Sequence, residues 1–146
     1  MHTTAESRDN YLYFMHLDTR WSDNDIYGHV NNVTYYSYFD TAANRFLIEK
    51  IGFDPYHDAF IGLVINSGCD YFAALAYPER LEIGLRIGHL GRSSLRYEIA
   101  IFQQGKATAA AQGHFVHVFV DRHTRQSTAI PDHMREALTS YIVQPT

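Results

Sequence analysis

One short polar segment, residues 20–32, carries the side chains best suited to chemistry on a carbonyl group. It holds two carboxylates two residues apart, followed by an imidazole and two amides: Asp23, Asp25, His29, Asn31 and Asn32. A carboxylate can act as a nucleophile or as a general base on a carbonyl carbon. The same residue types are frequent in turns and as helix N-caps. The residues alone therefore leave a catalytic and a purely structural interpretation open.

The segment ends where a long helix is expected to begin. Asn31 or Asn32 can cap this helix, and Gly52 with Pro55 can close it. Between them, apolar residues recur at helical spacing: Tyr35, Phe39, Ala42 or Ala43, and Phe46. The unpaired N–H groups at a helix N-terminus carry a partial positive charge and can stabilise an oxyanion. A carboxylate a few residues earlier in the chain can then act on the same carbon.

The elements that position this segment are expected to form an antiparallel α+β arrangement. Alternating apolar and polar residues predict most of them: strands at 11–18, 61–75, 81–88, 95–101 and 108–120, and a short helix at 131–142. We expect a sheet of about five strands wrapped around one long central helix. One helix cannot cover both faces of such a sheet, so association through the uncovered face or an edge strand is expected. Residues 1–9 should form a flexible tail and residues 10–146 a single domain.

Composition narrows the classes of protein. The chain has 146 residues, 46% of them hydrophobic, and a formal net charge of −4. This weak acidity argues against binding nucleic acid through bulk phosphate neutralisation. No stretch approaches the ~18 apolar residues of a membrane span, and no signal peptide is visible. We therefore expect a soluble cytoplasmic protein.

The histidines and the cysteine give little support to a metal or thiol mechanism. His114 and His117 are three residues apart in a predicted strand, so they should point to opposite faces. The lone Cys69 excludes a disulfide within the chain. In an apolar strand a cysteine is more often a small buried hydrophobic residue than a reactive thiolate. We predict neither a metal site nor a cofactor.

Two stretches resemble hotdog-fold acyl-CoA thioesterases of the 4-hydroxybenzoyl-CoA thioesterase family. The first is Arg-Trp-Ser-Asp-Asn-Asp-Ile-Tyr-Gly-His-Val-Asn-Asn at 20–32, followed by Tyr-Tyr-Ser-Tyr-Phe-Asp at 35–40. The second, residues 86–98, is similar to the paired central strands of that family. The resemblance covers roughly residues 10–140 and implies a hotdog fold. It also implies hydrolysis of an acyl-CoA thioester to the free acid and CoA.

The resemblance implies roles for three residues of the polar segment. In the family the second acidic residue of the Asp-x-Asp loop is catalytic, as nucleophile or general base, and this falls on Asp25. The amide that polarises the thioester carbonyl falls at the helix start, near Asn32. Asp23 is then structural. Several relatives have other residues where His29 and Asn31 stand, and we expect these two to position water or the catalytic carboxylate.

A second cluster could bind the nucleotide end of such a substrate. Arg92, Ser93 and Ser94 lie at a turn between two predicted strands, where a guanidinium and two hydroxyls can meet the phosphates of CoA. An ordinary solvated turn is the alternative, and the resemblance favours phosphate binding. Hotdog relatives place each active site at a subunit boundary. We therefore expect a homodimer or a dimer of dimers, which is a homotetramer.

Two other functions and one other catalytic residue stay open. A hotdog hydratase would use Asp and His, here Asp25 and His29, on an enoyl or hydroxyacyl thioester. A non-catalytic acyl-CoA-binding protein would bind the same ligand without turnover. One hotdog subfamily uses a carboxylate on the helix instead of the loop, which makes Asp40 the rival catalytic acid.

Overall fold

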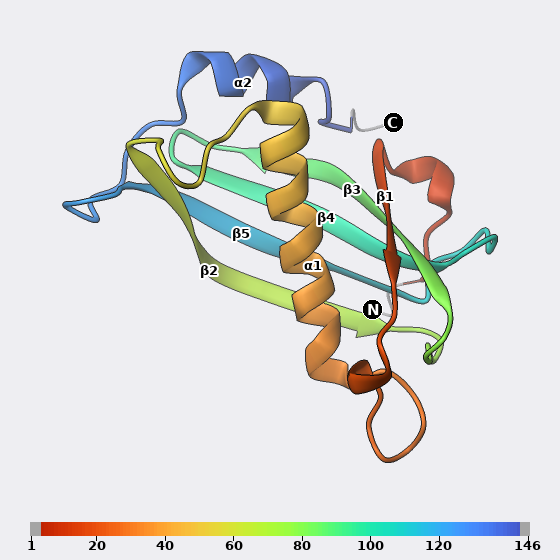
Figure 1. The fold of residues 1–146 in the computed structure, drawn as a ribbon. Coiled ribbons are helices and arrows are strands. Elements are labelled where there is room, and N and C mark those ends of the chain that lie inside the picture. The colour runs from red at the N-terminus through yellow and green to blue at the C-terminus, as the bar shows by residue number, and fades with distance from the viewer. Residues whose placement is uncertain (1–3, 144–146) are drawn as a thin grey trace.

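The computed structural model describes residues 4–143, which form one antiparallel sheet and two α-helices (Figure 1). Along the chain the elements are β1 (Tyr13–Asp18), α1 (Asn32–Phe46), β2 (Phe60–Tyr71), β3 (Arg80–Leu90), β4 (Ser94–Gln103), β5 (Ala111–Asp121) and α2 (Asp132–Thr139). The strand order is β1-β3-β4-β5-β2, and every neighbouring pair is antiparallel. The predicted α+β class is confirmed. None of the described helices has the length and apolar character needed to cross a membrane.

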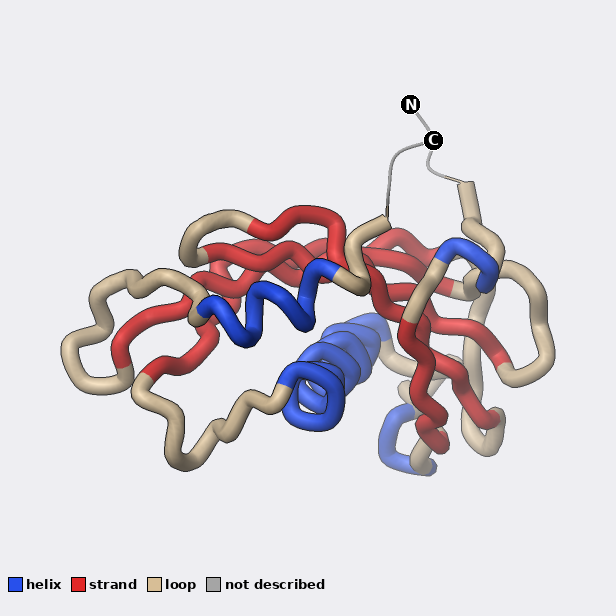
Figure 2. Tube along the Cα trace, turned by 90° about the horizontal axis from the view of Figure 1, so that it is seen from above, coloured by secondary structure: helices blue, strands red, loops and turns tan. Residues whose placement is uncertain are grey.

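The sheet wraps around α1 (Figures 1 and 2), which is the hotdog arrangement that the resemblance implied. The helix buries an aromatic and small-residue stripe against the sheet: Tyr35, Tyr38, Phe39, Ala42, Ala43 and Phe46. Gly113 of β5 permits this close approach, because a Cβ there would come within 2.7 Å of the Phe39 ring. A π-helical turn, Leu47–Ile51, extends α1 to Gly52. Gly52 has φ +84° and ends the helix, as the sequence predicts.

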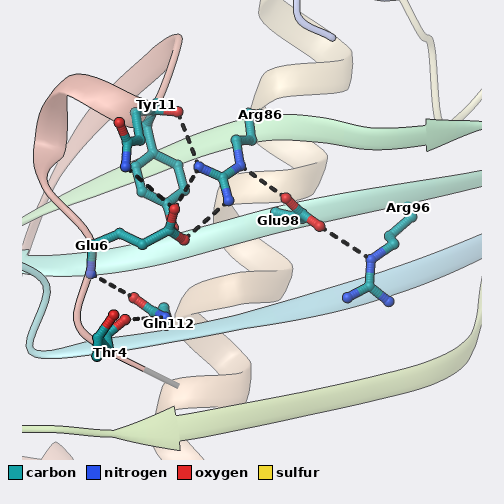
Figure 3. A network of polar contacts seen from close by, with 8 residues as sticks. Thr4, Glu6, Tyr11, Arg86, Arg96, Glu98 and Gln112 are labelled. Carbon is teal, nitrogen blue, oxygen red and sulfur yellow. Dashed lines mark hydrogen bonds and ion pairs between the residues drawn. The ribbon is translucent and has the colours of Figure 1, made fainter. Parts of the chain in front are cut away.

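The face of the sheet that turns away from α1 carries a network of polar side chains (Figure 3). Arg86 of β3 donates to the carboxylates of Glu6 and Glu98 at 2.8–3.0 Å, and its guanidinium lies over the Tyr11 ring. Residues 6–9, assigned to a loose tail by the sequence, thus belong to a segment that makes specific contacts with the sheet. Residues 1–3 of that tail and residues 144–146 of the expected domain lie outside the described residues.

Within residues 4–143 the two edge strands of the sheet are β1, which pairs with β3, and β2, which pairs with β5. The edge at β2 is apolar. Three adjacent apolar side chains on it, Leu63, Val64 and Ile65, are 39%, 45% and 62% exposed. Asp70 is the single charged residue of the strand. Edge strands of monomers usually carry charges or prolines that prevent pairing with another chain. Of the two routes predicted for association, pairing through an edge strand is therefore the one that the composition of β2 favours.

The predicted strand at 61–75 ends earlier, at Tyr71. The N–H groups of Phe72 and Ala73 both donate to the carbonyl of Ala110, at 2.8 and 3.1 Å. Two donors on one carbonyl cannot continue a strand ladder, in which each carbonyl takes its own partner. The chain then crosses toward the polar segment, where the Leu75 carbonyl accepts the Val30 N–H at 2.7 Å. This crossing builds the second wall of the candidate site.

Candidate active site

A cleft of about 570 Å³ lies where the loop between β1 and α1 meets the end of β2. One wall consists of Asp25, His29 and the first turn of α1, and the other of residues 71–74. Four sequence-predicted residues are therefore brought together here: Asp25, His29, Asn31 and Asn32. The opposite wall begins with two aromatic side chains and continues with two small ones, in the order Tyr71-Phe72-Ala73-Ala74. The cleft can accommodate an apolar group beside a carboxylate.

Asp23 anchors the loop. Its side chain is buried, and both oxygens are occupied: Oδ2 accepts the Tyr38 hydroxyl at 2.7 Å, and Oδ1 accepts the Arg20 guanidinium at 2.9 and 3.1 Å. Burial by itself raises the pKa of Asp23, but the hydrogen bonds from Tyr38 and Arg20 outweigh it and hold that pKa below its ordinary value. The Asp23 carbonyl also accepts the Asn31 N–H at 2.9 Å. Asp23 thus joins the loop to the helix cap.

Asp25 lies in a tight turn that leaves one of its oxygens available. Its N–H donates to the His29 carbonyl at 2.9 Å, and its carbonyl accepts the Gly28 N–H at 3.1 Å. Gly28 has φ +86°, a conformation that favours glycine. Oδ1 accepts the Tyr27 N–H at 2.9 Å, whereas Oδ2 lies 3.8 Å from Nδ1 of His29. The turn therefore fixes the carboxylate of Asp25 at the wall of the cleft, and within residues 4–143 Oδ2 accepts no hydrogen bond.

The N-terminus of α1 presents one unpaired donor next to this carboxylate. Asn31 is the N-cap, and its side chain accepts the Val33 N–H at 3.0 Å. Its carbonyl accepts the Thr34 N–H at 2.9 Å. Within residues 4–143 the Asn32 N–H has no hydrogen-bond acceptor, and Asn32 lines the cleft. A free N–H with the helix dipole behind it is suited to polarise a carbonyl.

Sequence reasoning missed the second wall. The Tyr71 hydroxyl donates to the Asn32 carbonyl at 3.1 Å, and its ring meets the Tyr35 ring edge-on, with centroids 4.9 Å apart. The stretch was predicted to be strand, and no spacing links it to the loop around Asp25. The one local signal was the change from two aromatic residues to Ala73 and Ala74, which marks a strand end.

Comparison with known proteins identifies the family. The profile of the thioesterase-like superfamily matches residues 19–138. The chain belongs to this superfamily. Among solved structures, PA5185 from Pseudomonas aeruginosa strain PAO1 is 51% identical with a TM-score of 0.94, over 98% of this chain and 100% of that one. PA2801, a candidate thioesterase from Pseudomonas aeruginosa, is 32% identical with a TM-score of 0.80, over 88% and 98% of the two chains.

A curated relative matches over a shorter stretch. The uncharacterized protein YsmA of Bacillus subtilis strain 168 is 28% identical over 90 residues, which is 62% of this chain and 60% of YsmA. Together these matches make the chain a thioesterase-like protein of hotdog fold and support thioester hydrolysis in general. They do not single out 4-hydroxybenzoyl-CoA as the substrate.

The predicted phosphate cluster of this thioesterase-like protein lies far from Asp25 in the same protomer. Arg92 and Ser93 lie in the turn between β3 and β4, and Ser94 begins β4. The Arg92 carbonyl accepts the Ile130 N–H at 2.8 Å, beside α2. This turn lies near the C-terminal end of α1, whereas the Asp25 loop lies at its N-terminal end (Figure 1). Twenty residues of helix separate the ends, or about 30 Å at 1.5 Å per residue. One protomer does not bring the two clusters together.

The rival nucleophiles lie outside the cleft of the thioesterase-like domain. Asp40 is exposed on α1, where its side chain accepts the Asn44 amide at 3.0 Å. Burial raises the pKa of Cys69 to about 11, so its thiol stays protonated at neutral pH. His114 and His117 face opposite sides of the sheet, as predicted. Within residues 4–143 no group of three or more His, Cys, Asp or Glu side chains could hold a metal ion.

Proposed function

We propose that this protein hydrolyses an acyl-CoA thioester to the free acid and CoA. The observation that carries the proposal is the placement of the open Oδ2 of Asp25 and the unpaired N–H of Asn32 in one cleft. A solved relative supports CoA as the carrier: the gentisyl-coenzyme A thioesterase BH1999 is 25% identical with a TM-score of 0.77, over 86% of this chain and 99% of that one.

In the proposed reaction the thioester oxygen accepts the Asn32 N–H at the end of α1. Asp25 either takes a proton from a water that attacks the carbonyl carbon, or attacks that carbon itself to form an anhydride that water then hydrolyses. In both routes the C–S bond breaks and the CoA thiolate takes up a proton. A positioned oxyanion donor contributes roughly 10²- to 10³-fold and a general base roughly 10²- to 10⁴-fold, which is ample for a labile thioester.

His29 and Asn31 have supporting roles in this proposal. Nδ1 of His29, 3.8 Å from Oδ2 of Asp25, can orient the carboxylate or the attacking water. Asn31 caps α1 by accepting the Val33 N–H, and the Asn32 N–H is then the first-turn donor left for a substrate in the cleft.

A second copy of the chain would complete the substrate site. Ser94 at the start of β4 pairs with Val118 of β5, and Val118 pairs in turn with Leu63 of β2. The Arg92 turn therefore lies toward the end of β2 that begins with Phe60. The other end of β2 contacts the start of α1 through Tyr71. Two copies related by a two-fold axis would pair their β2 edges antiparallel.

Such pairing would set the Phe60 end of one β2 strand beside the Tyr71 end of the other. The turn with Arg92 of the partner subunit would then lie about three strand spacings, or about 15 Å, from β2 of the first chain. That separation suits an extended substrate whose thioester and phosphates are far apart. We therefore propose a homodimer through β2, in which Arg92, Ser93 and Ser94 serve the site of the other chain.

A panel of acyl-CoAs, with free thiol measured during incubation, tests the proposed activity. Thiol release from at least one acyl-CoA is expected, and binding without release would instead indicate a non-catalytic acyl-CoA-binding protein. The Asp25–His29 proximity also fits a hydratase, which pairs the same residue types. Loss of the enoyl absorbance from an enoyl-CoA, with no thiol released, would establish that alternative and refute the hydrolase.

A further inference from the structure

Tyr71 connects the edge strand β2 to the first turn of α1. It is the last residue of β2, and its hydroxyl donates to the Asn32 carbonyl at 3.1 Å. Its ring packs edge-on against Tyr35, at an interplanar angle of 87°. The side chain is 46% exposed, so burial of the ring accounts for little of its placement. The contacts of Tyr71 are instead with the first turn of α1: the hydroxyl with Asn32, which lines the cleft, and the ring with Tyr35.

This hydrogen bond is not needed to satisfy the backbone. The carbonyl of a residue in the first turn of an α-helix already accepts the N–H four residues later, here that of Tyr36. The donors at the start of a helix lack partners, but its first carbonyls do not. A second donor on the Asn32 carbonyl therefore adds orientation to a group that is already paired.

The Asn32 N–H lies between two anchored peptide groups. The preceding peptide is held because the Asn31 N–H donates to the Asp23 carbonyl at 2.9 Å. The following peptide is held because the Asn32 carbonyl accepts the Tyr71 hydroxyl. With both neighbours fixed, the direction of the Asn32 N–H is set from two sides, by the loop and by the sheet.

We propose that Tyr71 is a positioning residue, which orients the Asn32 N–H toward the thioester carbonyl; this inference rests on the proposed function. Tyr71 acts through the first turn of the helix and not on the reacting atoms. Its ring also lines the cleft, where it can contact the acyl group in the ground state. The hydroxyl and the ring therefore have separable effects. Loss of the hydroxyl should lower kcat, and loss of the ring should also raise KM.

Tyr71→Phe removes the hydroxyl and keeps the ring against Tyr35. Loss of an oxyanion donor costs roughly 10²- to 10³-fold in kcat, so loosening one should cost less, about tenfold. KM should stay within about twofold. Tyr71→Ala should show the same loss of kcat together with a raised KM.

Tyr77→Phe is the matched control. Tyr77 is 42% exposed and packs edge-on against Trp21, with centroids 6.0 Å apart, much as Tyr71 packs against Tyr35. Within residues 4–143 its hydroxyl makes no hydrogen bond. The control variant should match the wild type in kcat, KM and melting temperature.

An amide measurement tests the inference without relying on turnover. In ¹⁵N NMR spectra, Tyr71→Phe should shift the Asn32 and Val33 signals and lower their order parameters, while the melting temperature stays within about 2 °C of the wild type. Unchanged amide signals and unchanged kcat in Tyr71→Phe would overturn the inference. If the wild type released no thiol from any acyl-CoA, the proposed hydrolysis would fail, and the amide signals would still decide whether Tyr71 orders this turn.

Discussion

Nδ1 of His29 lies 3.8 Å from Oδ2 of Asp25, the carboxylate oxygen that accepts no backbone N–H from residues 4–143. If His29 acts by orienting this carboxylate, its effect on the rate should vanish once the carboxylate is removed. His29→Ala should lower kcat about tenfold, within the range of an acid–base contribution. Adding His29→Ala to Asp25→Asn should cause almost no further loss. Independent, multiplicative losses in the double variant would show that His29 acts apart from Asp25.

Stability should depend on pH through His117. This side chain is buried with its Nδ1 3.0 Å from the Tyr97 hydroxyl, and burial lowers its pKa from 6.5 to about 4. Between these two values the unfolded chain binds a proton that the folded protein does not. The free energy of unfolding should therefore fall as pH decreases through this window, by up to about 3 kcal/mol at 1.36 kcal/mol per pKa unit.

The comparison for this prediction is His117→Gln, whose side chain stays neutral at all pH values. Urea unfolding at pH 7 and pH 4.5 should show a smaller loss of stability in the variant than in the wild type. The carboxylates, including Asp23, titrate in both proteins, so the difference between the two losses isolates His117. If the wild type and the variant lost the same stability between these pH values, the pKa of His117 would be the same in the folded and unfolded protein.

The sequence predicted the site residues that are close in the chain and missed those that are not. Asn31 was one of two possible caps, and its side chain does bond the Val33 N–H because capping is a local interaction. Tyr71 reaches Asn32 across 39 positions, through a strand end that alternation placed too late. Such a contact depends on where β2 stops, which is decided by tertiary hydrogen bonds to Ala110.

The network around Arg86 gives a second example. Alternation predicted the strands at 81–88 and 95–101, which hold Arg86 and Glu98, and the structure pairs these two residues across the strands. It could not show that Glu6 folds back onto Arg86 from 80 positions away. The position of Arg92 relative to Asp25 was likewise beyond local reasoning, because it depends on the direction of α1 across the whole sheet.

Association through β2 is tested by Ile65→Lys. Ile65 is 62% exposed in the protomer, so a lysine there should leave the fold intact, while a charge on the edge should prevent pairing of two strands. Light scattering should report the mass of a single chain, and thiol release should fall at least about tenfold as the shared site is lost. The control is Leu12→Lys. Leu12 precedes β1 and is 49% exposed, so this variant should keep the wild-type mass and the wild-type rate of thiol release. A fully active single chain would refute the shared site.

Arg92→Ala tests the proposed phosphate contact. A distant phosphate is bound equally in the ground state and the transition state, so KM should rise with kcat little changed. A charged hydrogen bond is worth about 1 to 3 kcal/mol and less when solvated, so the rise should be about 3- to 30-fold. A short-chain thioester without the nucleotide should be unaffected. If KM rose equally for both substrates, Arg92 would have a structural role. If KM rose for neither, the phosphates of CoA would bind at another site.

The most direct test of the account is the rate of thiol release by Asp25→Asn at saturating acyl-CoA, beside Asp23→Asn and Asp40→Asn. Asp25→Asn should lose at least about a hundredfold in kcat at an unchanged melting temperature, as expected for a nucleophile or general base. Asp23→Asn should lower the melting temperature, because its carboxylate holds Tyr38 and Arg20. Asp40→Asn should stay active. Near-normal turnover by Asp25→Asn, with an inactive Asp40→Asn, would contradict the account and assign the chemistry to the helix.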